Sequence, residues 1–162
     1  MTDTSHEIDT QVEASALPFG SNERDWVLAH VVRLTNVFGI GFELVLYTPT
    51  GVIAGKTISG QEYFDRIAKS FGDPSSKKAK DRLAGLFDSM GQQYKPDKED
   101  GTYSEDNPIQ TKIPQYIHLD NCKIFYPGHS PFPDNDGILW RGNLDKVVGF
   151  TFGSVSIEKK DA

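Results

Sequence analysis

The chain has 162 residues, of which 37% are hydrophobic, and a formal net charge of −6 at pH 7. This length supports one domain with a core that needs neither disulfides nor metals, and the acidic balance argues against nucleic acid as a partner. No apolar run approaches the roughly 20 residues that cross a bilayer. The acidic N-terminus lacks the features of a secretory signal, and the single cysteine fits a reducing compartment. We therefore expect a cytoplasmic protein without membrane contact.

The sequence predicts a single folded domain between two polar ends. Residues 1–21 are acidic and show no periodicity, so we predict a disordered lead-in. A β-rich domain is expected at residues 22–157, with an insertion at about 72–114. Residues 158–162 form a charged tail.

The first predicted element is a helix, with Ser21 or Asn22 as its N-cap. Asn36 and Gly39 mark its end. Five residues recur at three- and four-residue spacing and are expected to form its buried face: Trp26, Val27, His30, Val31 and Leu34.

A β-hairpin is predicted next. Residues 42–47 alternate with period two, which is typical of a half-buried strand. Pro49 and Gly51 favour a tight turn, and residues 52–58 return as the second strand. Gly55 in the middle of that strand indicates a bulge or a sharp bend.

Two helices and an irregular segment follow the hairpin. Helices are predicted at residues 60–71 and 76–94, and Glu62 and Arg66 are spaced to form an ion pair on the first. Residues 95–114 are rich in Pro, Asp, Glu, Lys and Gly and are expected to be the least ordered internal segment. The predicted buried stripes are Tyr63, Phe64 and Ile67 in the first helix and Ala79, Leu83, Leu86, Phe87 and Met90 in the second.

The last third of the chain is predicted to return to strands. Residues 116–119 and 123–126 are strand-like with a polar break between them, and residues 138–140 and 146–152 are two more strands, joined through 141–145. The fold class is therefore α+β. We expect a small, strongly bent antiparallel sheet or a closed barrel, with an N-terminal helix and a helical, acidic insertion.

No catalytic or metal-binding constellation stands out. His118 and Cys122 would form a base–nucleophile pair only if both side chains met on one strand face. No Gly-rich oxyanion turn accompanies Cys122, and a half-buried cysteine is the favoured interpretation. Asp134 and Asp136 precede a glycine but lack the remaining ligands of a calcium loop. We predict no catalytic residues, no metal and no cofactor.

Arg141 and Gly142 are the most informative candidates for a binding site. In a tight turn, the glycine would let a phosphate or carboxylate approach an exposed guanidinium. The alternative is a structural arginine that pairs with Asp145 or stacks on Trp140. Phe132 and Trp140 either add an exposed aromatic patch for a protein partner or belong to the core.

Three stretches, residues 25–64, 116–128 and 137–156, together resemble the gas vesicle accessory proteins of the U type (GvpU-like). The shared features are ISG followed by YF, the run YIHL, and WRG, in this order and with an acidic variable segment between the first two stretches. The resemblance covers roughly two-thirds of the chain. It implies a non-enzymatic cytoplasmic role in the assembly or clustering of gas vesicles, with gas vesicle proteins as partners.

A more distant resemblance is to Sm-like barrels, which have an N-terminal helix, a bent hairpin with a mid-strand glycine and a late strand entered through an Arg-Gly turn. Gly55 and Arg141-Gly142 stand at those places. This resemblance implies a barrel and assembly into a ring. Residues 59–62 replace the usual Asp and Asn of the Sm RNA-binding loop, so RNA binding is not carried over.

Three functional hypotheses remain. The first is a non-enzymatic interaction or assembly protein that acts by surface docking. In this hypothesis Arg141, Trp140 and Phe132 contact a partner on one side, and the acidic segment 97–106 offers a second surface. The second is an RNA-binding Sm-like module that forms a ring. The third is a small enzyme that uses His118 and Cys122. Homo-oligomerisation is compatible with the first two.

Overall fold

The computed structural model describes residues 25–70 and 77–155. The elements are α1 (Trp26–Phe38), β1 (Glu43–Thr48), β2 (Gly51–Thr57), α2 (Gly60–Ser70), α3 (Lys77–Gln92), α4 (Pro108–Thr111), β3 (Tyr116–Phe125), β4 (Ile138–Asn143), the 3-10 helix η1 (Leu144–Lys146) and β5 (Gly149–Phe152). The predicted lead-in and charged tail lie outside the described residues. No helix within the two described ranges is long and apolar enough to span a bilayer.

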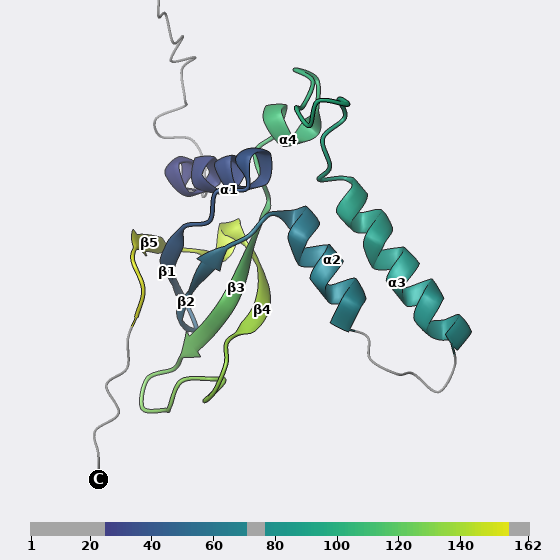
Figure 1. Cartoon of the computed structure of the whole chain (residues 1–162). Helices are drawn as coiled ribbons and strands as arrows, with labels where there is room; N and C mark the ends of the chain where they lie inside the picture. The colour runs from purple at the N-terminus through teal and green to yellow at the C-terminus, as the bar shows by residue number, and fades with distance from the viewer. Residues whose placement is uncertain (1–24, 71–76, 156–162) are drawn as a thin grey trace, which may run out of the picture.

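The five strands form one antiparallel sheet in the order β4-β3-β2-β1-β5 (Figure 1). This arrangement confirms the α+β class and the antiparallel sheet. Because β4 and β5 stand at opposite ends of the strand order, the sheet is open. The predicted Sm-like barrel is therefore not confirmed, since closing it would require these two strands to pair.

The β1–β2 hairpin forms as predicted, and Gly55 marks the irregularity in its second strand. The pairing of β2 with β3 shifts register between Ala54 and Lys56. A Cβ atom at Gly55 would lie 3.0 Å from the carbonyl oxygen of Asp120. A glycine is needed here because the two backbones approach closely at the bulge.

Helix α1 begins at a different cap from the predicted one. The side chain of Asp25 accepts hydrogen bonds from the backbone N–H groups of Val27 (2.8 Å) and Leu28 (3.1 Å). Asp25 is therefore the N-cap, and the predicted cap at 21–22 lies outside the described residues. The predicted end is confirmed, because Gly39 adopts the left-handed conformation (φ +67°) that closes many helices.

The buried face of α1 is rotated from the predicted face. The buried residues are Leu28, Ala29, Val31, Val32, Thr35 and Asn36. Trp26, Val27 and His30, predicted to be buried, are exposed. Apolar side chains lie on several sides of this helix, so their spacing did not determine which side meets the sheet.

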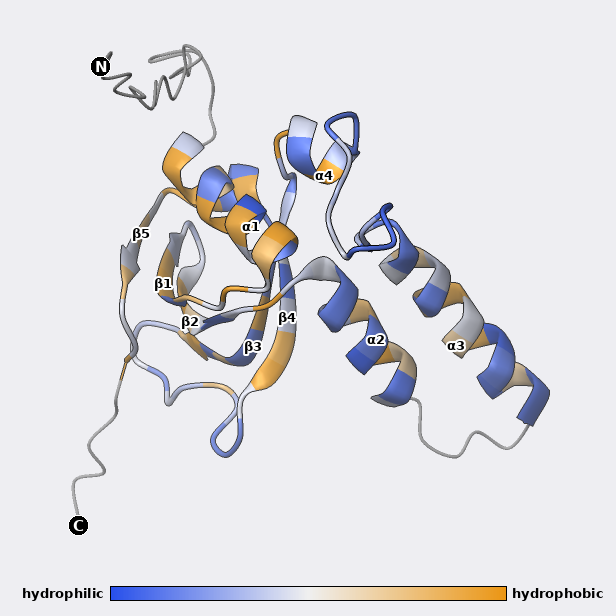
Figure 2. Ribbon diagram, turned by 45° about the horizontal axis from the view of Figure 1, so that its top comes forward, coloured by the Kyte–Doolittle hydropathy of each residue, from blue (hydrophilic) through white to orange (hydrophobic). Residues whose placement is uncertain are grey.

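The hydrophobic core lies between α1 and one face of the sheet (Figure 2). We call this the core face. Its buried side chains, together with those of α1 and η1, are Leu28, Val31, Val32, Leu44, Leu46, Ile53, Ile117, Leu119, Cys122, Leu144 and Val147. The opposite face of the sheet carries His118, Asp120 and Arg141 and contacts α2. We call it the hairpin face, after the helical hairpin that α2 forms with α3.

Strand β3 is one continuous ten-residue strand, which corrects the prediction of two strands with a break. Asn121 adopts a positive φ of 48°, and the register with β4 shifts between Leu119 and Cys122. Asp120 and Asn121 thus form a bulge within β3 and do not divide it into two strands. Pairing with β2 on one side and β4 on the other maintains the strand through the bulge.

Arg141 and Gly142 lie inside β4, not in a turn. Arg141 pairs with His118 and Gly142 pairs with Ile117 across the β3–β4 ladder. The turn follows two residues later, where Asn143 caps η1. The predicted tight Arg-Gly turn is therefore wrong, because cross-strand pairing extends β4 through a sequence rich in turn-forming residues.

Helices α2 and α3 pack side by side as a hairpin that projects from the sheet (Figure 1). The Ser59 hydroxyl accepts from the N–H of Glu62 (3.1 Å), which confirms the predicted cap. Phe64 of α2 is buried, as predicted. On α3, by contrast, Leu83 and Leu86 are 40% and 49% exposed and Ala79 is exposed as well, so the predicted buried stripe on this helix is wrong in these three positions.

The segment after α3 has defined structure where an irregular, poorly ordered loop was predicted. It contains α4, and Tyr103 within it is only 7% exposed. The Tyr103 hydroxyl lies within hydrogen-bond distance of the carbonyl oxygens of Asn36 (3.1 Å) and Tyr94 (2.8 Å). A single buried aromatic side chain thus attaches this polar segment to α1 and to the end of α3.

Candidate functional site

The residues predicted as one docking surface do not lie together. Trp140 and Arg141 are consecutive in β4, so their side chains point to opposite faces of the sheet. Trp140 packs against the core, whereas Arg141 contacts residues of the hairpin face. Phe132 lies in the loop between β3 and β4, where its backbone pairs with Ile124 (2.7 and 2.8 Å), and it is 57% exposed.

Gly142 has a packing role that its sequence context did not indicate. A Cβ atom at this position would lie 1.9 Å from the ring of Trp140. The indole therefore occupies the space above the Gly142 backbone on the core face. Gly142 makes room for an aromatic side chain of its own strand rather than for an approaching ligand.

Arg141 is held in one orientation by an aromatic ring and an imidazole. Its guanidinium carbon lies 3.6 Å from the centre of the Tyr116 ring and 5.9 Å from that of Phe64. Its Nε–H donates to Nε2 of His118 at 3.2 Å. Stacking and a fixed hydrogen bond restrict the rotation of the planar group. Neither structural alternative predicted for Arg141, pairing with Asp145 or stacking on Trp140, describes these contacts.

His118 is the buried centre of this cluster. It is 1% exposed, and its ring centre lies 4.8 Å from that of Tyr63, 5.9 Å from Phe64 and 5.7 Å from Tyr94. Burial, with the nearby positive charge of Arg141, lowers the pKa of His118 to about 3. The imidazole is therefore neutral at physiological pH. Since Nε2 accepts from Arg141, the proton resides on Nδ1, which has no hydrogen-bond partner among the described residues.

The geometry does not support the hypothesis of a His118–Cys122 active site. Cys122 is completely buried on the core face, where it pairs with Ile138 of β4, whereas His118 is on the hairpin face. Burial also raises the pKa of the Cys122 thiol to about 12, so the reactive thiolate is not populated at neutral pH. Cys122 behaves as a small apolar core residue.

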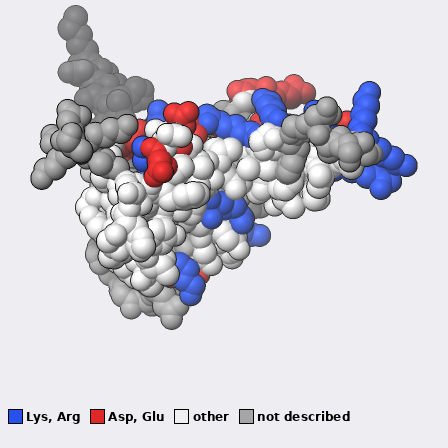
Figure 3. All heavy atoms as spheres, turned by 90° about the horizontal axis from the view of Figure 1, so that it is seen from below, with Lys and Arg blue, Asp and Glu red and all other residues white. Residues whose placement is uncertain are grey.

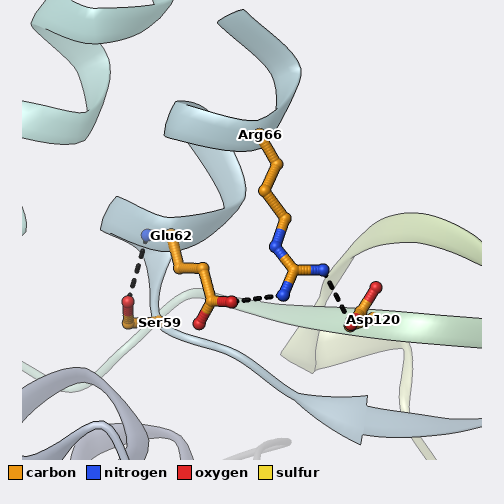
Figure 4. Close-up of polar contacts among 4 residues, drawn as sticks. All are labelled: Ser59, Glu62, Arg66 and Asp120. Atoms are coloured by element: carbon orange, nitrogen blue, oxygen red, sulfur yellow. Dashed lines mark hydrogen bonds and ion pairs between the residues drawn. The ribbon is translucent and has the colours of Figure 1, made fainter. Parts of the chain in front are cut away.

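An ion-pair network attaches α2 to the sheet beside this cluster (Figure 4). Arg66 contacts Glu62 one turn earlier on α2, as predicted, and its Nη1 lies 2.7 Å from Oδ2 of Asp120 on β3. The hydrogen bond with Asp120 is the main reason that the pKa of Arg66 is raised. The side chains are partly exposed, so the network contributes modestly to stability and mainly fixes where α2 sits.

A cavity of about 560 Å³ lies elsewhere on the molecule. Its lining residues are Glu43, Ala54, Gly55, Asn121, Lys123, Ser130, Pro131, Asp134, Asn135, Ser154 and Val155. Neither a histidine nor a cysteine is among them, and the charged side chains have mixed sign. Within residues 25–70 and 77–155, no group of three or more His, Cys, Asp or Glu side chains is placed to hold a metal ion.

The comparison with protein families identifies the chain. Residues 25–155 match the family model described as "Gas vesicle protein GvpU-like". The chain belongs to the GvpU-like family. The GvpU-like resemblance of the three sequence stretches is thereby confirmed, whereas the Sm-like resemblance has no such support. No curated protein and no solved structure matches the chain.

Several members of the side-chain cluster around His118 and Arg141 were not predicted from the sequence. Tyr116, Tyr94 and the Arg66–Asp120 ion pair were not proposed as contacts of Arg141 or His118. Alternation along β3 does place Tyr116 and His118 on one face. The missing information was the register of β3 with β4, which brings Arg141 opposite His118.

Proposed function

We propose that the chain is a non-enzymatic interaction protein that acts on gas vesicles in the cytoplasm, in their assembly or their clustering. The observation that carries this proposal is the match to the GvpU-like family over residues 25–155, which include every described helix and strand. The separation of His118 from Cys122 supports a role without covalent catalysis.

The docking surface in this proposal is the α2–α3 hairpin. Its second helix projects from the sheet and packs on α2 (Figure 1). Leu83 and Leu86 are exposed on α3, with Ala79 and Met90 completing a stripe at spacings of four, three and four residues. Such a stripe is what an amphipathic helix presents to a protein partner. The fold itself does not bury it, so it is available for a gas vesicle protein.

Charge supports the same surface. The start of α3 is basic, with Lys77, Lys78, Lys80 and Arg82, and Figure 3 shows Lys and Arg gathered at this far end of the molecule. The segment 97–106 beyond the other end of α3 is acidic. Hydrogen bonds from Ser104 and Thr102 lower the pKa values of Asp97 and Asp100, which keeps both ionised. Opposite charges at the two ends orient an incoming partner along the helix.

Flotation with purified gas vesicles tests the proposal. The full-length chain should rise with intact vesicles during centrifugation, and Leu86→Glu should reduce the bound fraction at least tenfold. Ile113→Glu is the matched control, because Ile113 is 60% exposed but lies outside the hairpin. A wild-type chain that stays in the lower fraction would contradict the vesicle role. Equal flotation of wild type and Leu86→Glu would contradict the docking surface.

A further inference from the structure

Strand β5 leaves one backbone edge open. It stands at the end of the strand order and pairs only with β1 among the described residues. The N–H of Gly153 donates to the carbonyl of Glu43 (2.8 Å). Because backbone groups alternate along a strand, the N–H and C=O groups of Thr151, two residues earlier, also point toward β1. By the same alternation, the N–H and C=O groups of Phe150 and Phe152 point away from the sheet. No described residue forms a hydrogen bond with these groups, so they can pair with another strand.

Apart from its short length of four residues, β5 lacks the features that usually protect an edge strand. Residues 147–155 contain no charged residue and no proline. Val148 is 74% exposed and Phe152 is 60% exposed. The other edge strand, β4, carries the charge of Arg141. Of the two edges, β5 is therefore the one suited to strand addition.

We infer that a second copy of this chain pairs with β5 antiparallel, across a two-fold axis at Thr151. In this register Phe150 lies opposite the partner's Phe152, and Phe152 opposite the partner's Phe150. Thr151 lies opposite its own copy. Aromatic pairs and Thr–Thr pairs are both favourable across antiparallel strands, and a two-fold interface requires a surface that is complementary to itself. The sequence Gly-Phe-Thr-Phe-Gly meets this requirement around its central threonine.

The apolar rows of the sheet continue across this axis. On the core face, Leu44 pairs with Phe152 and Leu46 pairs with Phe150, so each row gains the partner's phenylalanine and then the partner's leucine. The Phe152 ring also contacts Phe42, with centroids 6.1 Å apart. The chain has a net charge of −6, but no charge lies in the paired segment to oppose the contact.

The size of the contact sets its strength. Stable complexes bury about 800 Å² per partner, more than a strand of four residues with its neighbouring side chains supplies. The dimer is therefore weak, with a dissociation constant in the range of roughly 1–100 µM. This inference goes beyond the proposed function and does not depend on vesicles.

Charge reversal at Thr151 tests both the contact and its axis. Sedimentation of the full-length chain over a concentration series should show a monomer that converts to a dimer. Thr151→Lys and Thr151→Glu each place like charges opposite each other and should weaken dimerisation at least tenfold. A 1:1 mixture of the two variants should restore it, because the axis then brings Lys opposite Glu. Thr50→Lys and Thr50→Glu are matched controls, since Thr50 is exposed in the β1–β2 turn, and should dimerise like the wild type.

Three results would overturn the inference. The first is a wild-type chain that remains monomeric throughout the concentration range. The second is a Thr151→Lys variant that dimerises as strongly as the wild type. The third is a ring or an open-ended series of species, which would indicate head-to-tail pairing of unlike edges instead of a two-fold axis. No vesicles are present in this experiment, so its failure leaves the flotation result unaffected.

Discussion

The two faces of the sheet use different kinds of interaction. On the core face, Leu44, Leu46, Ile117 and Leu119 are completely buried beneath α1. On the hairpin face, the aromatic rings of α2 contact an arginine and an imidazole of the sheet, and Arg66 of α2 forms a partly exposed ion pair with Asp120. Burial of apolar surface stabilises the fold strongly and depends little on the orientation of the side chains. These polar contacts contribute less to stability but require specific distances and angles.

Because of this difference, one face mainly determines the stability of the domain and the other mainly determines the orientation of α2 and α3. Full burial of one large aliphatic side chain contributes about 1.5–3 kcal/mol. A partly exposed ion pair such as Arg66–Asp120 contributes roughly 0.2–1 kcal/mol. The core face therefore holds the domain folded, and the hairpin face determines where α2 and α3 project.

The largest effect is expected on the core face. Leu119→Ala removes a completely buried side chain and should lower the free energy of unfolding by about 2–5 kcal/mol. Urea unfolding measures this change. Leu83→Ala is the matched control, because this leucine is exposed on α3, and it should change stability by less than about 0.5 kcal/mol. Equal losses in the two variants would erase the distinction between the core and the hairpin.

A smaller, pH-dependent effect is expected from the hairpin face. The pKa of His118 in the folded protein is about 3, below the ordinary histidine value of 6.5. The unfolded state therefore takes up the proton first, and stability is lost as pH falls from 6.5 toward 3, by about 1.4 kcal/mol per pH unit from this group. Beside the imidazole, Tyr63 is uncharged at this pH because burial raises its pKa, and Arg141 carries the positive charge.

Urea unfolding between pH 7 and pH 5 measures this dependence. His118→Phe keeps a ring in the cluster but cannot titrate, so its stability should fall less steeply as pH is lowered. His30→Phe is the control, because His30 is exposed on α1, and it should retain the wild-type slope. Identical slopes for wild type and His118→Phe would show that the imidazole is not the titrating group.

The smallest effect is expected at Gly85, and it should be opposite in sign to the effect at Gly142. Gly142→Ala forces the Trp140 ring to move and should cost about 1–3 kcal/mol. Gly85→Ala introduces a methyl group into open space on helix α3 and should stabilise the protein by roughly 0.4–1 kcal/mol. Thermal unfolding of both variants measures the contrast. A neutral Gly142→Ala would show that Trp140 does not need the space above this backbone.

Local signals predicted much of the fold. Pro49 with Gly51 and the mid-strand Gly55 predicted the hairpin and its bulge, and Gly39 predicted the end of α1. Ser59 predicted the start of α2. In each case the residue itself restricts the backbone or supplies the capping group, so no distant contact is needed.

Features set by distant contacts could not be predicted in the same way. The bulge at Asn121 stays within β3 because two neighbouring strands hold it. Arg141 and Gly142 belong to a strand for the same reason, although their composition favours a turn. The Tyr103 hydroxyl reaches a carbonyl 67 residues away. The candidate cluster around His118 depends on the β3–β4 register, and a single sequence does not determine it.

Amide hydrogen exchange of the full-length chain, with and without purified gas vesicles, tests the central claim most directly. If the hairpin docks on vesicles while the core face only supports the fold, vesicles should slow exchange in α3 and in residues 97–106. Exchange in β1, β2 and β3 should be unchanged. Vesicle-dependent protection confined to the central strands, or no protection anywhere, would contradict this division between the two faces.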